Sequence, residues 1–215
     1  MSTTNSFFST VETIILNLCI LAMCGVLGGA FWFQFYEGEF PCPLCLLQRM
    51  GMMLATIGPM LIIIHGRHRP LAWGSVGGIG YGTAIIGALL GMSMSARQVL
   101  LHIVPPDPGY GSPVFGMHLY TWALVVFMAV IGVCALMLIF GGSLSSSSGG
   151  ASETRHGWKS MAWYSKFTFV VLALITLINI FSAFAEAGFN LYIPDNPESY
   201  LLFENPAEGA KDAAP

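Results

Sequence analysis

Five long apolar segments dominate the chain, and each is long enough to cross a lipid bilayer as a helix. A transmembrane helix needs about 20 predominantly apolar residues. Only 9% of the 215 residues are charged, whereas a soluble domain usually carries about 25%. We therefore predict an all-α polytopic membrane protein. Its predicted spans are Val11–Phe35, Leu46–Ile64, Leu71–Gly91, Leu119–Phe140 and Phe167–Ala187.

The positions of the cations predict how these spans are oriented. Lys and Arg concentrate in cytoplasmic loops, so we expect the loops after the second and fourth spans on the cytoplasmic side. The N-terminus is then cytoplasmic, whereas Cys42, Cys45 and the C-terminus lie on the opposite, outer side of the membrane. The cations in the two loops are Arg67, Arg69, Arg155, Lys159 and Lys166.

A Gly/Ser-rich stretch divides the chain. We predict a four-helix membrane domain in residues 1–140, followed by a cytoplasmic linker and interfacial segment in 141–166. Runs of Gly and Ser behave as flexible connectors. Residues 167–188 are predicted to form a fifth transmembrane helix, which such a linker allows to stand apart as an appendage. A periplasmic acidic tail is expected in 189–215.

Cys42 and Cys45 form a C-x-x-C pair at the start of the second span. Two thiols at this spacing close or open a small disulfide ring, so the pair can store two electrons. Arg49 follows one helical turn after Cys45, where a fixed cation stabilises a thiolate or another anion. Two alternatives stay open: a purely structural disulfide, and an Arg49 side chain that only reaches to the membrane interface. We expect no metal site, because zinc usually needs four ligands.

The outer end of the third span carries three polar residues, Arg97, Gln98 and His102. Polar groups at this depth are costly unless they face protein, water or a ligand. Each residue is therefore a candidate ligand contact. The alternatives are an interfacial anchor for Arg97 and ordinary helix-end positions for the other two. The loop that follows is rich in Pro and Gly, which excludes a long helix or strand there.

Two stretches carry a resemblance to a known family. The segment Cys42-Pro43-Leu44-Cys45-Leu46-Leu47-Gln48-Arg49, at the head of the second span, resembles the disulfide bond formation protein B (DsbB) family. The stretch from Arg97 through His102 to Asp107 is similar to the region after that family's third span. The resemblance covers roughly residues 11–140 and implies a DsbB-like four-helix transmembrane bundle, to which the fifth span is added.

The resemblance also implies a function. Members of the family are bacterial inner-membrane enzymes that oxidise a periplasmic thioredoxin-like (DsbA-type) oxidoreductase and pass the electrons to quinone. Cys42 and Cys45 would be the catalytic pair, with Cys42 forming the mixed disulfide and Cys45 facing a ubiquinone or menaquinone. We expect membrane lipid as a further partner and no nucleic acid. The residues implied to contact the quinone are Arg49, Arg97, Gln98 and His102.

The chain departs from the family pattern in two respects. Family members carry a second cysteine pair in the loop before the fourth span, whereas this loop has none and Ser112 stands near the first expected position. The fifth span is also additional. A partner would then attack the Cys42–Cys45 disulfide directly. Two other functions stay open: a membrane thiol reductase with reversed electron flow, and a non-catalytic scaffold.

Overall fold

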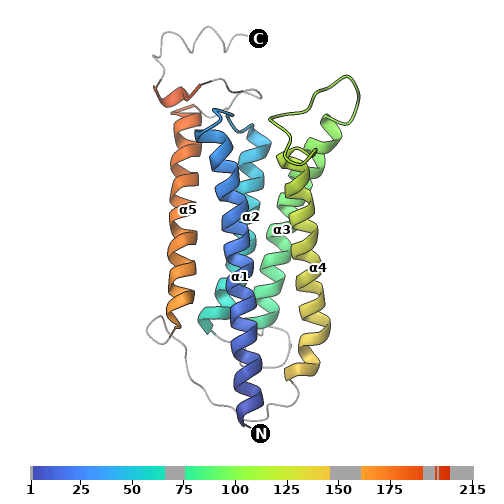
Figure 1. The fold of residues 1–215 in the computed structure, drawn as a ribbon, viewed down its shortest axis with the longest axis vertical. Helices are drawn as coiled ribbons and strands as arrows, with labels where there is room; N and C mark the ends of the chain where they lie inside the picture. The colour runs from blue at the N-terminus through green and yellow to red at the C-terminus, as the bar shows by residue number, and fades with distance from the viewer. Residues whose placement is uncertain (1, 66–75, 146–160, 191–196, 198, 204–215) are drawn as a thin grey trace.

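The computed structural model describes residues 2–65, 76–145, 161–190, 197 and 199–203, and the regular structure of these residues is helical. Five long helices run side by side along the long axis of the molecule (Figure 1). α1 and α5 both end at the upper end in that view, which also holds the α1–α2 and α3–α4 connections. The elements are α1 (Ser2–Phe35), α2 (Pro43–His65), α3 (Val76–Leu101), α4 (Leu119–Ser145), α5 (Trp163–Ala187) and the short 3-10 helix η2 (Leu201–Phe203).

All five long helices contain a segment that is long and apolar enough to cross a membrane. Large apolar side chains such as Leu18, Ile86 and Leu177 lie exposed on the outside of the bundle, where a soluble protein would carry polar groups. The predicted polytopic helical membrane protein is therefore confirmed.

The bounds of several helices differ from the predicted spans. α3 continues to Leu101 instead of ending at Gly91, because Ser95 and Gln98 face the interior and are buried there. Its predicted start at Leu71 lies outside the described residues. α4 extends to Ser145, so the first residues of the predicted Gly/Ser linker are helical. The rest of that linker, up to residue 160, is also outside the described part of the chain.

Glycines allow α2 and α3 to pack closely. A Cβ atom added to Gly51 of α2 would lie 2.7 Å from Gly91 Cα of α3, and one added to Gly58 would overlap the Gly80 backbone. Membrane helices gain little from hydrophobic burial against each other, so close backbone contact between small residues is their main source of association. This interface fixes α3, and with it Gln98, against the C-x-x-C helix.

We expect Gly51→Ala to lower the free energy of unfolding by about 1–3 kcal/mol, because the added methyl group meets backbone that has no side chain to rearrange. The midpoint of unfolding in a detergent titration measures this change. Gly82→Ala is the matched control, since a Cβ atom there has no neighbour within 4 Å. Equal midpoints for the two variants would contradict this account of the α2–α3 interface.

α5 packs against α1 over most of its length. Asn17 Nδ2 donates to Ser165 Oγ at 2.9 Å near one end, and Gln34 Nε2 donates to Ser182 Oγ at 2.7 Å near the other. Both pairs join residues 148 positions apart in the chain, so the two helices run parallel and in one register. α5 is therefore part of the bundle and does not stand apart as an appendage.

Candidate redox site

Cys42 and Cys45 lie at the N-terminus of α2, and the structure holds both as free thiols. Cys42 is the residue before the helix, and its Sγ accepts a hydrogen bond from the Cys45 backbone N–H at 3.2 Å. Pro43 occupies the first helical position, where its missing N–H has no partner to lose. The C-x-x-C spacing therefore lets one sulfur cap the helix while the other stands one turn inside it.

Gln98 of α3 contacts both sulfurs. Its Nε2 lies 3.2 Å from Cys42 Sγ and 3.5 Å from Cys45 Sγ. The amide is fixed in this orientation because Gln48 Nε2 donates to Gln98 Oε1 at 2.7 Å. An N–H donor directed at both sulfurs is suited to stabilise negative charge on either of them.

The environment of Cys42 differs from that of Cys45. Cys42 is 6% exposed, and a side-chain hydrogen bond with Cys45 together with burial raises the pKa of the Cys42 thiol above its ordinary value. Cys45 is less buried and lines a pocket. Cys42 is thus the more buried of the two cysteines, although it lies nearer the loop in the sequence.

Arg49 is buried inside the bundle, with 6% of its surface exposed. Its Nη1 donates to Gln34 Oε1 at 2.7 Å and its Nη2 to the Ala30 carbonyl at 3.4 Å. The guanidinium also stands 4.9 Å from the centre of the Phe31 ring. These contacts with α1 exclude the alternative in which Arg49 only reaches to the membrane interface.

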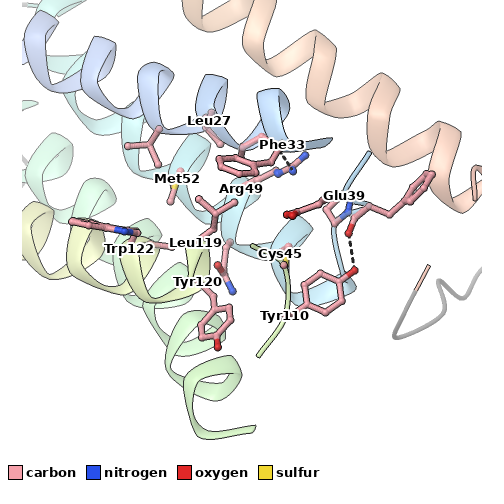
Figure 2. A pocket seen from close by; sticks show the side chains of 17 residues that line it. Leu27, Phe33, Glu39, Cys45, Arg49, Met52, Tyr110, Leu119, Tyr120 and Trp122 are labelled. Atoms are coloured by element: carbon pink, nitrogen blue, oxygen red, sulfur yellow. Dashed lines mark hydrogen bonds between the residues drawn. The ribbon is translucent and has the colours of Figure 1, made fainter. Parts of the chain in front are cut away.

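A pocket of about 100 Å³ lies beside the cysteine pair, between α1, α2, α4 and the two connections at this end. Figure 2 shows Cys45, Arg49, Tyr110 and Tyr120 around it, with apolar side chains along its deeper part. Apolar pockets with a few convergent polar groups are the usual form of small-molecule sites. The cavity volume is of the order that accommodates one six-membered ring.

The α3–α4 loop closes over the Cys42 segment. Tyr110 Oη donates to the Phe40 carbonyl at 2.6 Å, a bond drawn in Figure 2. Glu39 Oε1 accepts the Ser112 backbone N–H at 3.0 Å. Ser112, which stands near the position of a family cysteine, therefore lies within hydrogen-bond distance of the chain that leads into the C-x-x-C pair.

Comparisons with known proteins identify relatives of this chain. The family model described as "Disulfide bond formation protein DsbB" matches residues 12–112. A disulfide bond formation protein B from Marinobacter nauticus is 32% identical over 127 residues, which is 55% of this chain and 69% of that protein. The chain belongs to the DsbB family. It is thus a multi-pass inner-membrane protein of a family named for disulfide bond formation.

Other DsbB-family relatives match a shorter stretch. The protein from Chromobacterium violaceum is 37% identical over 93 residues, 42% of this chain and 52% of that protein. The one from Chromohalobacter salexigens is 36% identical over 89 residues, 40% of this chain and 49% of that protein. The chain thus spans about half the length of these two curated relatives. No solved structure matches it significantly.

The structure separates the DsbB-like residues predicted on α3 and after it. Gln98 reaches the sulfurs, but Arg97 is exposed on another face of the helix and does not line the pocket. His102 Nδ1 lies 2.8 Å from Asp107 Oδ2, and its ring stands 5.7 Å from the ring of Tyr120, which does line the pocket. The Gly109 backbone N–H and His102 hold the pKa of Asp107 below its ordinary value.

Several residues of this DsbB-family site were not predicted. Gln34 is the one amide in the aromatic stretch that ends the first predicted span. A single polar residue in such a stretch was the sequence signal that could have identified it. Gln48 and Tyr110 carried no distinct signal. Glu186, in the last turn of α5, is fully buried. Tyr200, just before η2, returns to the bundle: its Oη lies 3.4 Å from Gln34 Nε2 and its ring packs against Phe40.

Proposed function

We propose that this DsbB-family protein is a quinone-dependent thiol oxidase that reoxidises a periplasmic thioredoxin-like (DsbA-type) oxidoreductase. The observation that carries the proposal is that Cys45 and the buried Arg49 line the same small pocket at the N-terminal end of α2. A structural disulfide in a scaffold requires neither a buried cation nor a pocket beside it.

The first half of the reaction is thiol–disulfide exchange. A thiolate of the partner attacks Cys42 Sγ of the Cys42–Cys45 disulfide, so a partner–Cys42 bond forms and the Cys42–Cys45 bond breaks. The departing sulfur is preferably that of the more acidic thiol, and the raised pKa of Cys42 therefore favours departure of Cys45. The partner's second thiol then displaces Cys42. The partner is oxidised by two electrons and the protein is left as a dithiol.

The pocket residues fit a quinone as the acceptor. Apolar side chains such as Leu27 and Met52 supply walls for a ring, and Arg49 supplies N–H donors suited to a carbonyl oxygen. A ubiquinone or menaquinone there would take up two electrons and two protons from the dithiol, leaving as the quinol while the Cys42–Cys45 disulfide re-forms. Gln98 Nε2 lies 3.5 Å from Cys45 Sγ, and the Arg49 charge interacts electrostatically with the same sulfur.

We further propose that the C-x-x-C end of the bundle faces the periplasm. Lys166 lies near the start of α5, at the end opposite to the cysteine pair. In the sequence, Arg155 and Lys159 precede α5, and Arg67 and Arg69 fall between α2 and α3. Lys and Arg favour the cytoplasmic side. The N-terminus is then cytoplasmic, while Cys42 and the end of α5 are periplasmic, where an oxidised pair persists.

The test is quinone reduction by the purified chain in lipid nanodiscs, with a reduced thioredoxin-like protein as donor. We expect loss of quinone absorbance that requires both donor and chain, with a short-chain ubiquinone or menaquinone analogue. Cys134→Ser, in a buried position of α4 away from the pocket, is expected to keep full activity. No turnover by a folded chain with either quinone would contradict the proposal. Disulfide reduction driven by quinol would indicate the reductase instead.

A further inference from the structure

Glu186 places a carboxyl group in the interior of the redox end of the bundle. The side chain is 0% exposed, and neither carboxylate oxygen has a hydrogen-bond partner among the described residues. A buried carboxylate of this kind is stable only if an opposite charge lies nearby. Its position on α5 is one turn from Ser182, so both residues lie on the face that packs against α1.

Arg49 is a buried cation whose hydrogen-bond acceptors carry no charge. The hydrogen bonds that its guanidinium donates go to Gln34 and Ala30, which are both uncharged. Gln34 in turn donates to Ser182 on α5, so a continuous chain of contacts leads from Arg49 to the turn that carries Glu186. The Arg49 cation interacts electrostatically with both Glu186 and Cys45.

We propose that Glu186 is a positioning residue of the redox site, whose carboxylate balances the Arg49 charge and competes with the Cys45 sulfur for that cation. The proposal rests on the proposed function, since it assigns the fifth helix a role in that chemistry. While Cys42 and Cys45 are joined, the sulfurs are neutral and Glu186 is the anion that holds Arg49. When Cys45 departs as a thiolate, two anions share one cation.

This competition limits how strongly Arg49 stabilises the Cys45 thiolate. A dithiol whose thiolate is strongly stabilised resists reoxidation. Glu186 therefore keeps the pair able to release its electrons. The titratable and charged groups that face Glu186 are Arg49 and Cys45 from α2 and Tyr110 from the α3–α4 loop, whereas α1 contributes the uncharged Gln34.

The test measures the acidity of Cys45 in a Cys42→Ser background by alkylation rate against pH, with peptide mass spectrometry to separate Cys45 from the other cysteines. Glu186→Gln is expected to shift the midpoint to lower pH by about one unit, because the competing charge is removed. Glu186→Asp keeps the charge and is expected to stay near the unsubstituted midpoint. The matched control is Glu12→Gln, a carboxyl that contacts Tyr81 at the other end of the bundle.

The action through Arg49 is tested separately. In an Arg49→Met background, Glu186→Gln is expected to shift the Cys45 midpoint much less, because only the direct repulsion between Glu186 and Cys45 is then removed. An unchanged or higher midpoint in Glu186→Gln alone would overturn the proposal. So would an Asp variant that behaves like the Gln variant while circular dichroism shows it folded, or an equal shift in the Arg49→Met background. Alkylation needs neither quinone nor partner, so a failed oxidase assay leaves this result interpretable.

Discussion

Replacement of Cys45 by serine is expected to abolish quinone-dependent thiol oxidation and to leave Cys42 as the site at which the partner becomes trapped. The loss is complete because the Cys42–Cys45 disulfide cannot form, and no other described cysteine lies at the pocket. Without Cys45, the protein lacks the neighbouring thiol that would attack the partner–Cys42 disulfide and release the partner. Turnover should fall to the rate of the uncatalysed reaction.

A partner protein with a single active-site cysteine, activated as a mixed disulfide with a small aromatic thiol, would measure the trapping. Cys45→Ser should capture it as a covalent complex on a non-reducing gel, and mass spectrometry should locate the bond at Cys42. Burial still raises the pKa of Cys42 in this variant, whereas the contribution of the Cys45 thiol is lost, so the capture is measured from neutral to alkaline pH. The matched variant is Cys42→Ser. Faster capture by Cys45 in that variant would reverse the proposed roles of the two sulfurs.

Replacement of Arg49 by methionine is expected to lower kcat/KM for quinone by about 100-fold. Methionine fills a similar volume but removes the fixed donors and charge, and loss of one such preorganised donor typically costs about 3 kcal/mol in the transition state. The initial rate of quinone reduction over a range of quinone concentrations measures this loss.

Arg97→Met is the matched control for that experiment, because it removes the same charge from an exposed position on α3. We expect it to change kcat/KM by less than about twofold. Equal losses in the two variants would show that Arg49 acts only through the overall charge of the protein. Circular dichroism and gel filtration in detergent verify that both variants keep the helical bundle.

The membrane class and the core of the site could be predicted from sequence because they depend on local signals. Apolar length alone indicates the spans, and the C-x-x-C motif followed by Arg49 places two thiols and a cation at the head of one helix. Gln98 and Arg97 show where this reasoning ends. They are neighbours in sequence, but successive residues of a helix point about 100° apart, so only tertiary packing decides that Gln98 meets the sulfurs and Arg97 does not.

Glu186 and Gln34 illustrate the same limit over a longer distance. No spacing rule connects an acid in the last helix with an amide in the first, since their proximity follows from the parallel packing of α1 and α5. The continuation of α3 past Gly91 was missed because Ser95 and Gln98 lower its hydropathy, although both are buried against neighbouring helices.

The register between α1 and α5 has a consequence for biosynthesis. Ribosomes deliver a chain from its N-terminus, so α1 to α4 and the cysteine pair enter the bilayer while α5 is still being made. Until α5 has inserted, the Gln34 amide that accepts the Arg49 hydrogen bond lacks its own acceptor, the Ser182 hydroxyl. α5 thus completes a site whose two cysteines were synthesised much earlier, so the site cannot mature before the fifth span has inserted.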